Sequence, residues 1–247
     1  MPDAARPFFK MPDTAMIFAA GLGTRMRPIT NALPKPLVKV GGKALLDHVL
    51  DRFAEAGVAR AIVNVHYLPD QIERHLARRA APRVIVSDER ALLLDQGGGI
   101  KKALPLLGDR PFFVANTDAF WTEGAEPNLR RLAAAWDPAK MDALLLLAAT
   151  KGSVGVDWDG DFHIDAAGRL TRRREPEFAP FVYSGVGILK PELFAGETRD
   201  VFRLAPTFFA AAEQGRLFGV PLEGAWMHVG TPDAIGEAER ALARPER

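Results

Sequence analysis

A glycine-rich turn that carries two arginines follows the first apolar run of the chain. The run TAMIFAA (14–20) leads directly into GLGTRMR (21–27). Glycines let the backbone turn tightly and bring N–H groups close to phosphate oxygens. Arginine, here Arg25 and Arg27, can bind phosphate through two parallel hydrogen bonds. The segment therefore predicts a polyphosphate site, and the alternative is an ordinary turn with surface arginines.

A second segment holds a lysine on stiff backbone. Lys35 lies between Pro34 and Pro36. Each proline fixes its own φ angle and restricts the residue before it, so Lys35 is held on a rigid segment. A lysine that serves only solubility needs no such framing, and we expect Lys35 to act together with the glycine turn.

The glycine turn does not match two common phosphate-binding motifs. Met26 stands where a dinucleotide fingerprint has its third glycine. The pair Gly42-Lys43 is followed by Ala44 instead of the Ser or Thr of a Walker loop. The pattern therefore indicates phosphate binding of another type.

The elements around these segments are typical of a parallel sheet. Short apolar runs that do not alternate suit strands buried on both faces, and they occur at 14–20, 62–65, 84–86, 112–115 and 144–147. Helical patterns lie between them at 44–56, 70–79 and 129–135. This alternation predicts an α/β fold: one Rossmann-like domain with a mixed, mostly parallel central sheet flanked by helices.

The pattern changes after residue 150. The expected elements there are strands at 154–158, 162–164 and 181–189, a hairpin turn at Gly168, and helices at 204–213 and 232–242. We expect a small β region beside the main sheet within one domain, 14–247. Residues 1–13 are expected to form a flexible extension, because they are polar and lack the apolar core of a secretory signal.

Composition excludes several kinds of chemistry. The 247 residues include no cysteine, so disulfides, cysteine zinc sites and thiol nucleophiles are excluded. Lys and Arg total 32 against 31 for Asp and Glu, which argues against a nucleic-acid binder. No apolar run approaches the ~18 residues of a membrane span. The absence of cysteine is compatible with a reducing cytosol, and we expect a cytoplasmic protein.

Three segments together, at 21–27, 34–36 and 40–43, resemble the sugar-phosphate nucleotidyltransferases, and the resemblance extends over about 14–242. It implies transfer of a nucleotidyl group from an NTP to a sugar 1-phosphate, with release of pyrophosphate. It also implies that Arg25, Lys35 and Asp118 are catalytic and that Asp118 binds Mg²⁺, with Mn²⁺ as an alternative. Such chemistry is mostly positioning and charge neutralisation, which suits a site without a Ser-His or Cys-His pair.

The same resemblance assigns the remaining site residues. It divides the domain into a nucleotide-binding half at about 14–120 and a sugar-binding half at about 121–235, and likens 94–100 to a second nucleotide loop. The implied nucleotide-binding residues are Ala20, Gly21, Gly23, Thr24, Arg25, Gln96, Gly97, Gly98 and Asn116. The implied sugar-binding residues are Asp161, Glu175, Ser184, Gly185 and Arg203. For Gln96, Glu175 and Arg203 the alternative is an ordinary exposed polar side chain.

His228 departs from the family pattern, which has a second metal-binding aspartate at this place. Neutral imidazole suits Mg²⁺ poorly, because Mg²⁺ prefers oxygen ligands. Three interpretations follow. Asp118 alone holds the metal with the nucleotide phosphates, or Asp161 or Asp233 compensates, or metal binding is lost and the protein binds sugar nucleotides without turnover.

The resemblance also bears on the substrates. The segments at 97–99, 102–109 and 160–162 are most similar to family members that transfer UMP from UTP to N-acetylmuramate 1-phosphate in cell-wall recycling. The main alternative is transfer of GMP to mannose 1-phosphate. We expect small-molecule substrates, no nucleic-acid or membrane partner, and a monomer or small homo-oligomer.

Overall fold

The computed structural model describes residues 11–243. Most of the expected flexible extension therefore lies outside the described residues. At Asp13 the chain already belongs to the folded domain, because the Asp13 carbonyl accepts hydrogen bonds from the Ala59 and Arg60 N–H groups at 2.9 and 3.0 Å. Among residues 11–243, no helix is both long and apolar enough to cross a membrane.

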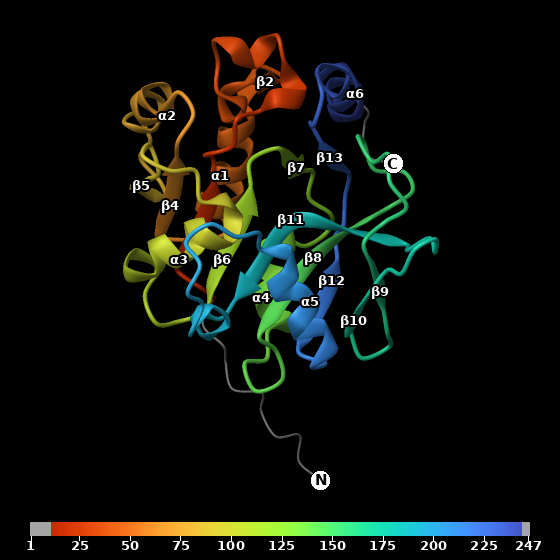
Figure 1. Ribbon diagram of the computed structural model, residues 1–247. Helices are drawn as coiled ribbons and strands as arrows, with labels where there is room; N and C mark the ends of the chain where they lie inside the picture. The colour runs from red at the N-terminus through yellow and green to blue at the C-terminus, as the bar shows by residue number, and fades with distance from the viewer. Residues whose placement is uncertain (1–10, 244–247) are drawn as a thin grey trace.

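A mixed sheet forms the centre of the molecule (Figure 1). Its parallel part is β6-β1-β4-β5, made of β6 (Phe112–Asn116), β1 (Thr14–Phe18), β4 (Arg60–Val65) and β5 (Arg83–Asp88). β11 (Phe181–Leu189) runs antiparallel to β6 and to β8 (Ala143–Ala149), and β12 (Leu217–Pro221) pairs with β8 in parallel. The hairpin of β9 (Phe162–Ile164) and β10 (Leu170–Arg172) extends the sheet from β11. The predicted α/β fold with a mixed, mostly parallel sheet is confirmed.

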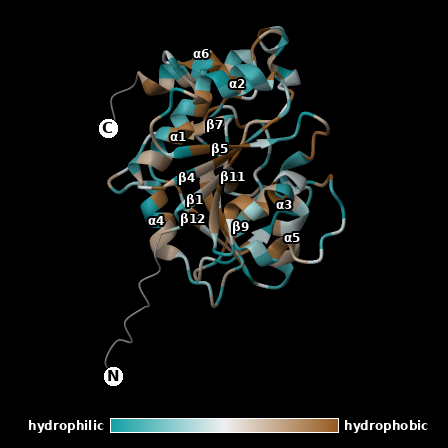
Figure 2. Ribbon diagram, turned by 90° about the vertical axis from the view of Figure 1, so that its left-hand side faces the viewer, coloured by the Kyte–Doolittle hydropathy of each residue, from teal (hydrophilic) through white to brown (hydrophobic). Residues whose placement is uncertain are grey.

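Helices cover both faces of this sheet. α1 (Leu45–Glu55), α2 (Pro69–Leu76) and α4 (Asn128–Ala135) pack on one face, and α3 (Asp95–Leu107) and α5 (Ala205–Glu213) pack on the other. Successive residues of β1 point to opposite faces of the sheet: Ile17 packs in the core under α1, and Met16 packs in the core under α3. Figure 2 shows the apolar strands between α4 on one side and α3 and α5 on the other.

A third apolar cluster lies beyond the carboxyl ends of the parallel strands. There α6 (Pro232–Leu242) packs with the two-stranded sheets β2 (Lys39–Val40)–β3 (Lys43–Ala44) and β7 (Ala119–Trp121)–β13 (Trp226–His228). These small sheets carry the segments on either side of the predicted phosphate site. They bring β13, from the end of the chain, against residues that follow β6.

Most predicted elements are present, and two expectations were wrong. Residues 154–158 form no strand and contribute only an isolated bridge from Val154 to Met227. The expected loop at 94–100 is largely the start of helix α3. The predicted helix at 70–79 ends earlier, at Leu76. The predicted hairpin turn at Gly168 is confirmed, with φ +83° between β9 and β10.

The register of the sheet positions the site. Phe18, the last residue of β1, pairs with Asn64 on one side and with Asn116 on the other. The loops that follow these strands therefore emerge at one edge. Open α/β sheets bind ligands at such carboxyl ends.

Candidate active site

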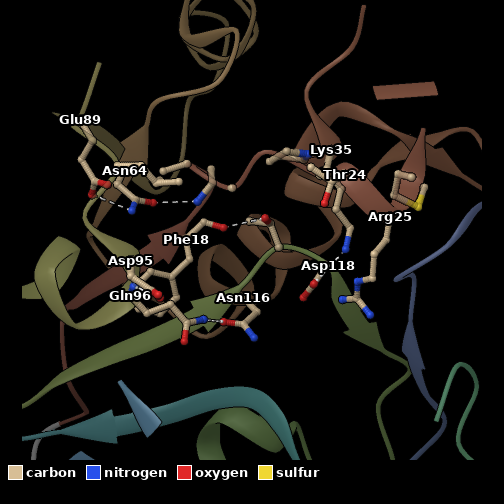
Figure 3. Close-up of a pocket in the computed structure, with 18 of the residues that line it drawn as sticks. Phe18, Thr24, Arg25, Lys35, Asn64, Glu89, Asp95, Gln96, Asn116 and Asp118 are labelled. Carbon is tan, nitrogen blue, oxygen red and sulfur yellow. Dashed lines mark hydrogen bonds and ion pairs between the residues drawn. The ribbon is translucent and has the colours of Figure 1, made fainter. Parts of the chain in front are cut away.

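A cavity of about 490 Å³ opens at this edge (Figure 3). The turn after β1, the Lys35 segment, the start of α3 and the residues after β6 line it. The predicted site residues that line it are Ala20, Gly21, Gly23, Thr24, Arg25, Lys35, Gln96, Asn116 and Asp118. The structure thus brings together most of the expected nucleotide-binding residues and the three expected catalytic residues.

The glycine turn forms one wall of the cavity. Gly23 has φ +63°, and a Cβ there would meet the Lys35 Cβ at 3.0 Å, so the turn packs directly on the lysine segment. The N–H groups of Ala20, Gly21 and Gly23 donate no hydrogen bond within residues 11–243. Backbone donors that line a cavity without a protein partner are suited to bind an anionic ligand.

Lys35 and Asp118 form an ion pair inside the cavity, with 2.9 Å between the Lys35 Nζ and Asp118 Oδ2. Their side chains are only 12% and 27% exposed. Burial raises the pKa of the Asp118 carboxyl, but the His228 ring and the Lys35 ammonium outweigh that effect, so its pKa lies well below its usual value. Asp118 is therefore an ionised carboxylate that holds Lys35 in place.

Arg25 brings a second cation to the cavity. Its guanidinium forms no ion pair or hydrogen bond within the described part of the chain. A Cβ at Gly230 would lie 3.3 Å from Arg25 Nη1, so the missing side chain at Gly230 leaves room for the arginine. Because Arg25 is not neutralised by a carboxylate, its charge is available to a phosphate.

His228 lies next to Asp118 although it does not line the cavity. Its Nε2 is 3.6 Å from Asp118 Oδ2, and its Nδ1 is 3.1 Å from the Gly155 carbonyl. The ring stacks on Trp226 and meets the edge of Trp158, with both centroids at 5.9 Å. A carbonyl only accepts, so Nδ1 carries a hydrogen and Nε2 faces the carboxylate.

The acidic side chains near Asp118 do not form a metal site by themselves. Across the described residues, no group of three His, Asp or Glu side chains is placed to hold a metal ion. Asp161 accepts hydrogen bonds from the Trp158 indole and the Tyr183 N–H, at 3.1 and 2.9 Å. A single cavity carboxylate fits a Mg²⁺ ion that takes its other ligands from substrate phosphates and water.

The triple glycine packs against the segment 200–202. The N–H groups of Gly97 and Gly98 both bond to the Phe202 carbonyl, at 3.0 and 3.2 Å. A Cβ on Gly97 would overlap the Phe202 ring, and one on Gly98 would overlap the Asp200 carbonyl. These contacts dock α3 against 200–202, and neither glycine lines the cavity, so their expected place beside the base and ribose stays a prediction. Gln96 does line the cavity, and its Nε2 donates to Asn116 Oδ1 at 2.7 Å.

The expected sugar-binding residues are not gathered around the cavity. Glu175 and Arg203 have side chains 88% and 84% exposed, and Arg203 lies 3.9 Å from Asp95. Ser184 is buried, and Gly185, at φ +89°, packs on Asn116. Asp161 holds the backbone of β11, as described above. The structure therefore leaves the sugar site without a defined set of side chains.

Asn64 and Glu89 are among the cavity residues that the sequence interpretation did not assign. Glu89, only 1% exposed, accepts hydrogen bonds from Asn64 Nδ2 at 2.8 Å and from the Leu94 N–H at 3.2 Å. Burial raises the pKa of the Glu89 carboxyl, against the opposing effect of these two hydrogen bonds. Asn64 interrupts the apolar run IVNV, and that interruption was the signal available in the sequence.

Comparison with known proteins gives close relatives over nearly the whole chain. An N-acetylmuramate alpha-1-phosphate uridylyltransferase of Caulobacter vibrioides is 51% identical, covering 94% of this chain and 98% of the relative. Its counterpart from Neisseria meningitidis serogroup B is 38% identical, covering 93% and 97%. A mannose-1-phosphate guanyltransferase of Neurospora crassa is 29% identical, covering 88% of this chain and 61% of the relative.

Solved structures and family patterns agree with these relatives. The inositol-1-phosphate CTP transferase from T. maritima has the same fold, with a TM-score of 0.76 at 15% identity, covering 97% of this chain and 100% of that one. The family model of the MobA-like NTP transferase domain matches residues 15–182. The predicted resemblance to sugar-phosphate nucleotidyltransferases is confirmed, and this chain belongs to the family of MobA-like NTP transferases.

Proposed function

We propose that this protein transfers UMP from UTP to N-acetylmuramate α-1-phosphate, giving UDP-N-acetylmuramate and pyrophosphate. Nucleotidyl transfer is supported by the convergence of Arg25, Lys35 and Asp118 in one cavity, beside backbone N–H groups that have no partner within residues 11–243. The choice of substrates follows the relative that is 51% identical over 94% of the chain.

The proposed reaction needs little acid–base chemistry. A phosphate oxygen of the sugar phosphate forms a bond to the α-phosphorus of UTP, and the bond from that phosphorus to the bridging oxygen of the β-phosphate breaks. The bonding pair leaves with pyrophosphate. The attacking group is already an anion, so the protein contributes alignment and positive charge.

The cavity residues divide this work. Lys35, held by Asp118, is positioned to bind the α-phosphate or the incoming phosphate. Arg25 is free to bind the β- and γ-phosphates as their charge grows. The N–H groups of Ala20, Gly21 and Gly23 supply further donors without the cost of reorganising a loop.

Mg²⁺ is the metal that we propose for this reaction, with Mn²⁺ as a substitute. Asp118 would hold it, together with phosphate oxygens of the nucleotide. When bound, such an ion neutralises phosphate charge and aligns the groups that react. Among the described residues no larger ligand cluster is available, which favours one carboxylate and disfavours compensation by Asp161.

The product of this reaction is a nucleotide-activated cell-wall sugar. We therefore propose that the protein works in the recycling of cell-wall material, in the cytoplasm, where UTP is available. Its substrates are small molecules. We propose that it acts as a monomer or a small homo-oligomer.

The deciding experiment measures pyrophosphate release with UTP, GTP, CTP and dTTP, each against N-acetylmuramate 1-phosphate, mannose 1-phosphate and glucose 1-phosphate. We expect the highest kcat/KM for UTP with N-acetylmuramate 1-phosphate, and no product without Mg²⁺ or Mn²⁺. Preference for GTP with mannose 1-phosphate would instead assign a guanylyltransferase. UDP-sugar binding without pyrophosphate release under any metal would assign a non-catalytic binder.

A further inference from the structure

A buried chain of hydrogen bonds connects two walls of the cavity (Figure 3). The Ala19 N–H donates to Asn64 Oδ1 at 2.8 Å, and Asn64 Nδ2 donates to Glu89 Oε1 at 2.8 Å. The second oxygen of the same carboxylate, Oε2, accepts from the Leu94 N–H at 3.2 Å. Ala19 precedes the glycine turn and Leu94 precedes α3, so one carboxylate is tied to both walls.

The backbone around Glu89 is itself fixed. The Glu89 N–H donates to the carbonyl of Val65, the last residue of β4. The Glu89 carbonyl lies at hydrogen-bond distance, 2.8 Å, from the Nδ1 atom of His66, which directly follows β4. A Cβ at Gly99 would lie 2.8 Å from Glu89 Oε1, so the third glycine of the triple glycine lets α3 approach the carboxylate. The chain of bonds is therefore enclosed and has a single arrangement.

We infer that Glu89 and Asn64 are positioning residues for nucleotide binding: together they orient the Ala19 peptide and the start of α3 so that the glycine turn presents its free N–H groups to the nucleotide. This inference rests on the proposed function, nucleotidyl transfer, and concerns how the same cavity binds its nucleotide. Neither residue is assigned a part in the chemistry.

The direction of the hydrogen bonds carries the inference. Ala19 and Leu94 both offer N–H donors, so the two ends of the chain require acceptors. Between them, one side chain must donate to the other. The pair works with one carboxylate and one amide, since two carboxylates repel and two amides leave one donor facing another.

This polarity defines the test, because the pair can be exchanged. In Glu89→Gln, either Asn64 or Leu94 loses its acceptor, and in Asn64→Asp two acceptors face each other. In the double variant, Gln at 89 donates to Asp at 64, the Ala19 N–H still finds a carboxylate oxygen, and the Leu94 N–H finds the amide oxygen. The net charge and volume of the pair are unchanged.

UTP binding by calorimetry and steady-state KM values for both substrates are the measurements. We expect each single variant to weaken UTP binding, and to raise the KM for UTP, by about tenfold or more, with little change in the KM for the sugar phosphate. We expect the double variant to recover most of that loss. Double-variant binding no better than the weaker single variant would overturn the positioning role.

A matched control separates positioning from stability. Asn128 and Glu123 form another amide–carboxylate pair, which is partly buried, with 2.7 Å between Asn128 Nδ2 and Glu123 Oε2, and neither residue lines the cavity. Glu123→Gln is expected to lower the melting temperature and leave the KM for UTP unchanged. Equal KM effects at Glu123 and Glu89 would show a general loss of stability instead.

The failure of the proposed function is distinguishable from the failure of this inference. Wild-type protein is measured first with UTP and with GTP as probes. If it binds GTP and not UTP, the uridylyl assignment fails, and the variants are tested with GTP for the same pattern of loss and recovery. If wild-type protein binds neither nucleotide, both the function and the positioning role are overturned.

Discussion

The two cations of the cavity, Lys35 and Arg25, differ in whether a carboxylate neutralises them. Asp118 fixes the Lys35 ammonium at 2.9 Å and offsets part of its charge, whereas Arg25 has no partner within residues 11–243. Low exposure of the ion pair strengthens each of these interactions relative to water. Under the proposed function, a nucleotide in this cavity would meet one cation that is held in place and one that is free to move onto its phosphates.

The Lys35 position gives a kinetic prediction. Lys35→Met removes a positioned charge and leaves the Asp118 carboxylate unpaired, so we expect kcat to fall by about 10²–10³-fold. Rapid-quench or coupled pyrophosphate assays measure the change. Lys39→Met, an exposed lysine in β2, is the control and is expected to keep wild-type activity. Wild-type kcat in Lys35→Met would refute the role of this ammonium.

Asp118→Asn tests the second half of the pair. The amide keeps the shape of the side chain but removes its charge, so the Lys35 ammonium loses its anion and the proposed metal site loses its protein carboxylate. We expect kcat to fall by about 10²-fold or more and the Mg²⁺ concentration for half-maximal rate to rise. A titration of rate against Mg²⁺ and Mn²⁺ gives both values. An unchanged titration curve would contradict the metal assignment.

The sequence analysis identified side chains that have distinctive neighbours along the chain. It missed side chains that are brought to the cavity only by the pairing of distant strands. Lys35 is framed by two prolines and Arg25 lies in the glycine turn GLGTR, which makes both recognisable. Asn64 and Glu89 are 45 and 70 residues from Ala19, so their connection appears only when β4 pairs with β1 and β5 pairs with β4. The expected sugar-binding residues depend on loop conformations that residue types do not fix.

At the level of elements, α3 depends on tertiary contacts more than on its own sequence. Its first turns contain three successive glycines (97–99), and Pro105 lies near its end; both residue types are unfavourable in a helix. The N–H groups of Gly97 and Gly98 bond to the Phe202 carbonyl, and the missing side chains let 200–202 approach. The strands, in contrast, are apolar on both faces and are predictable from their own residues.

Two glycine-to-alanine changes separate the effect of tertiary packing on a helix from the effect of intrinsic helix propensity. Gly97→Ala would overlap the Phe202 ring, and we expect it to lower the free energy of unfolding by about 1–3 kcal/mol. Gly236→Ala, within α6, would meet only the flexible end of Arg240 at 3.4 Å, and we expect a gain of up to about 1 kcal/mol. Urea unfolding measures both. A stabilising Gly97→Ala would show that α3 does not dock as described.

At the level of the whole molecule, one carboxylate connects the ends of three neighbouring strands. Asp142, before β8, accepts from Arg216, before β12, at 2.6 and 2.8 Å, and from Lys190, after β11, at 3.1 Å. Hydrogen bonds from Arg216 lower the pKa of the Asp142 carboxyl, partial burial raises it, and Lys190 lowers it again, so the net direction is down. The ionised form is therefore preferred in the folded protein.

This preference makes stability depend on pH. A lowered folded-state pKa contributes stability above the ordinary aspartate pKa of about 3.9 and loses it as the pH falls through the folded-state value. We expect Asp142→Asn to lower the free energy of unfolding by about 1–3 kcal/mol at pH 7, and by less at pH 3. Denaturant unfolding at both pH values measures this. Asp109→Asn, at an exposed aspartate, is the control, and a pH-independent difference for Asp142→Asn would refute the linkage.

The antiparallel placement of β11 beside β6 also affects how the chain is made. β1, β4, β5 and β6 lie within the first 116 residues, but the outer neighbour of β6 is β11, at Phe181–Leu189. During synthesis, the edge of a strand that reads FFVAN stays without its partner until that later segment leaves the ribosome. An open apolar edge pairs readily with other chains. Slower translation between β6 and β11 would therefore lower the yield of soluble protein. This would happen although all the parallel strands that position the cavity have already been synthesised.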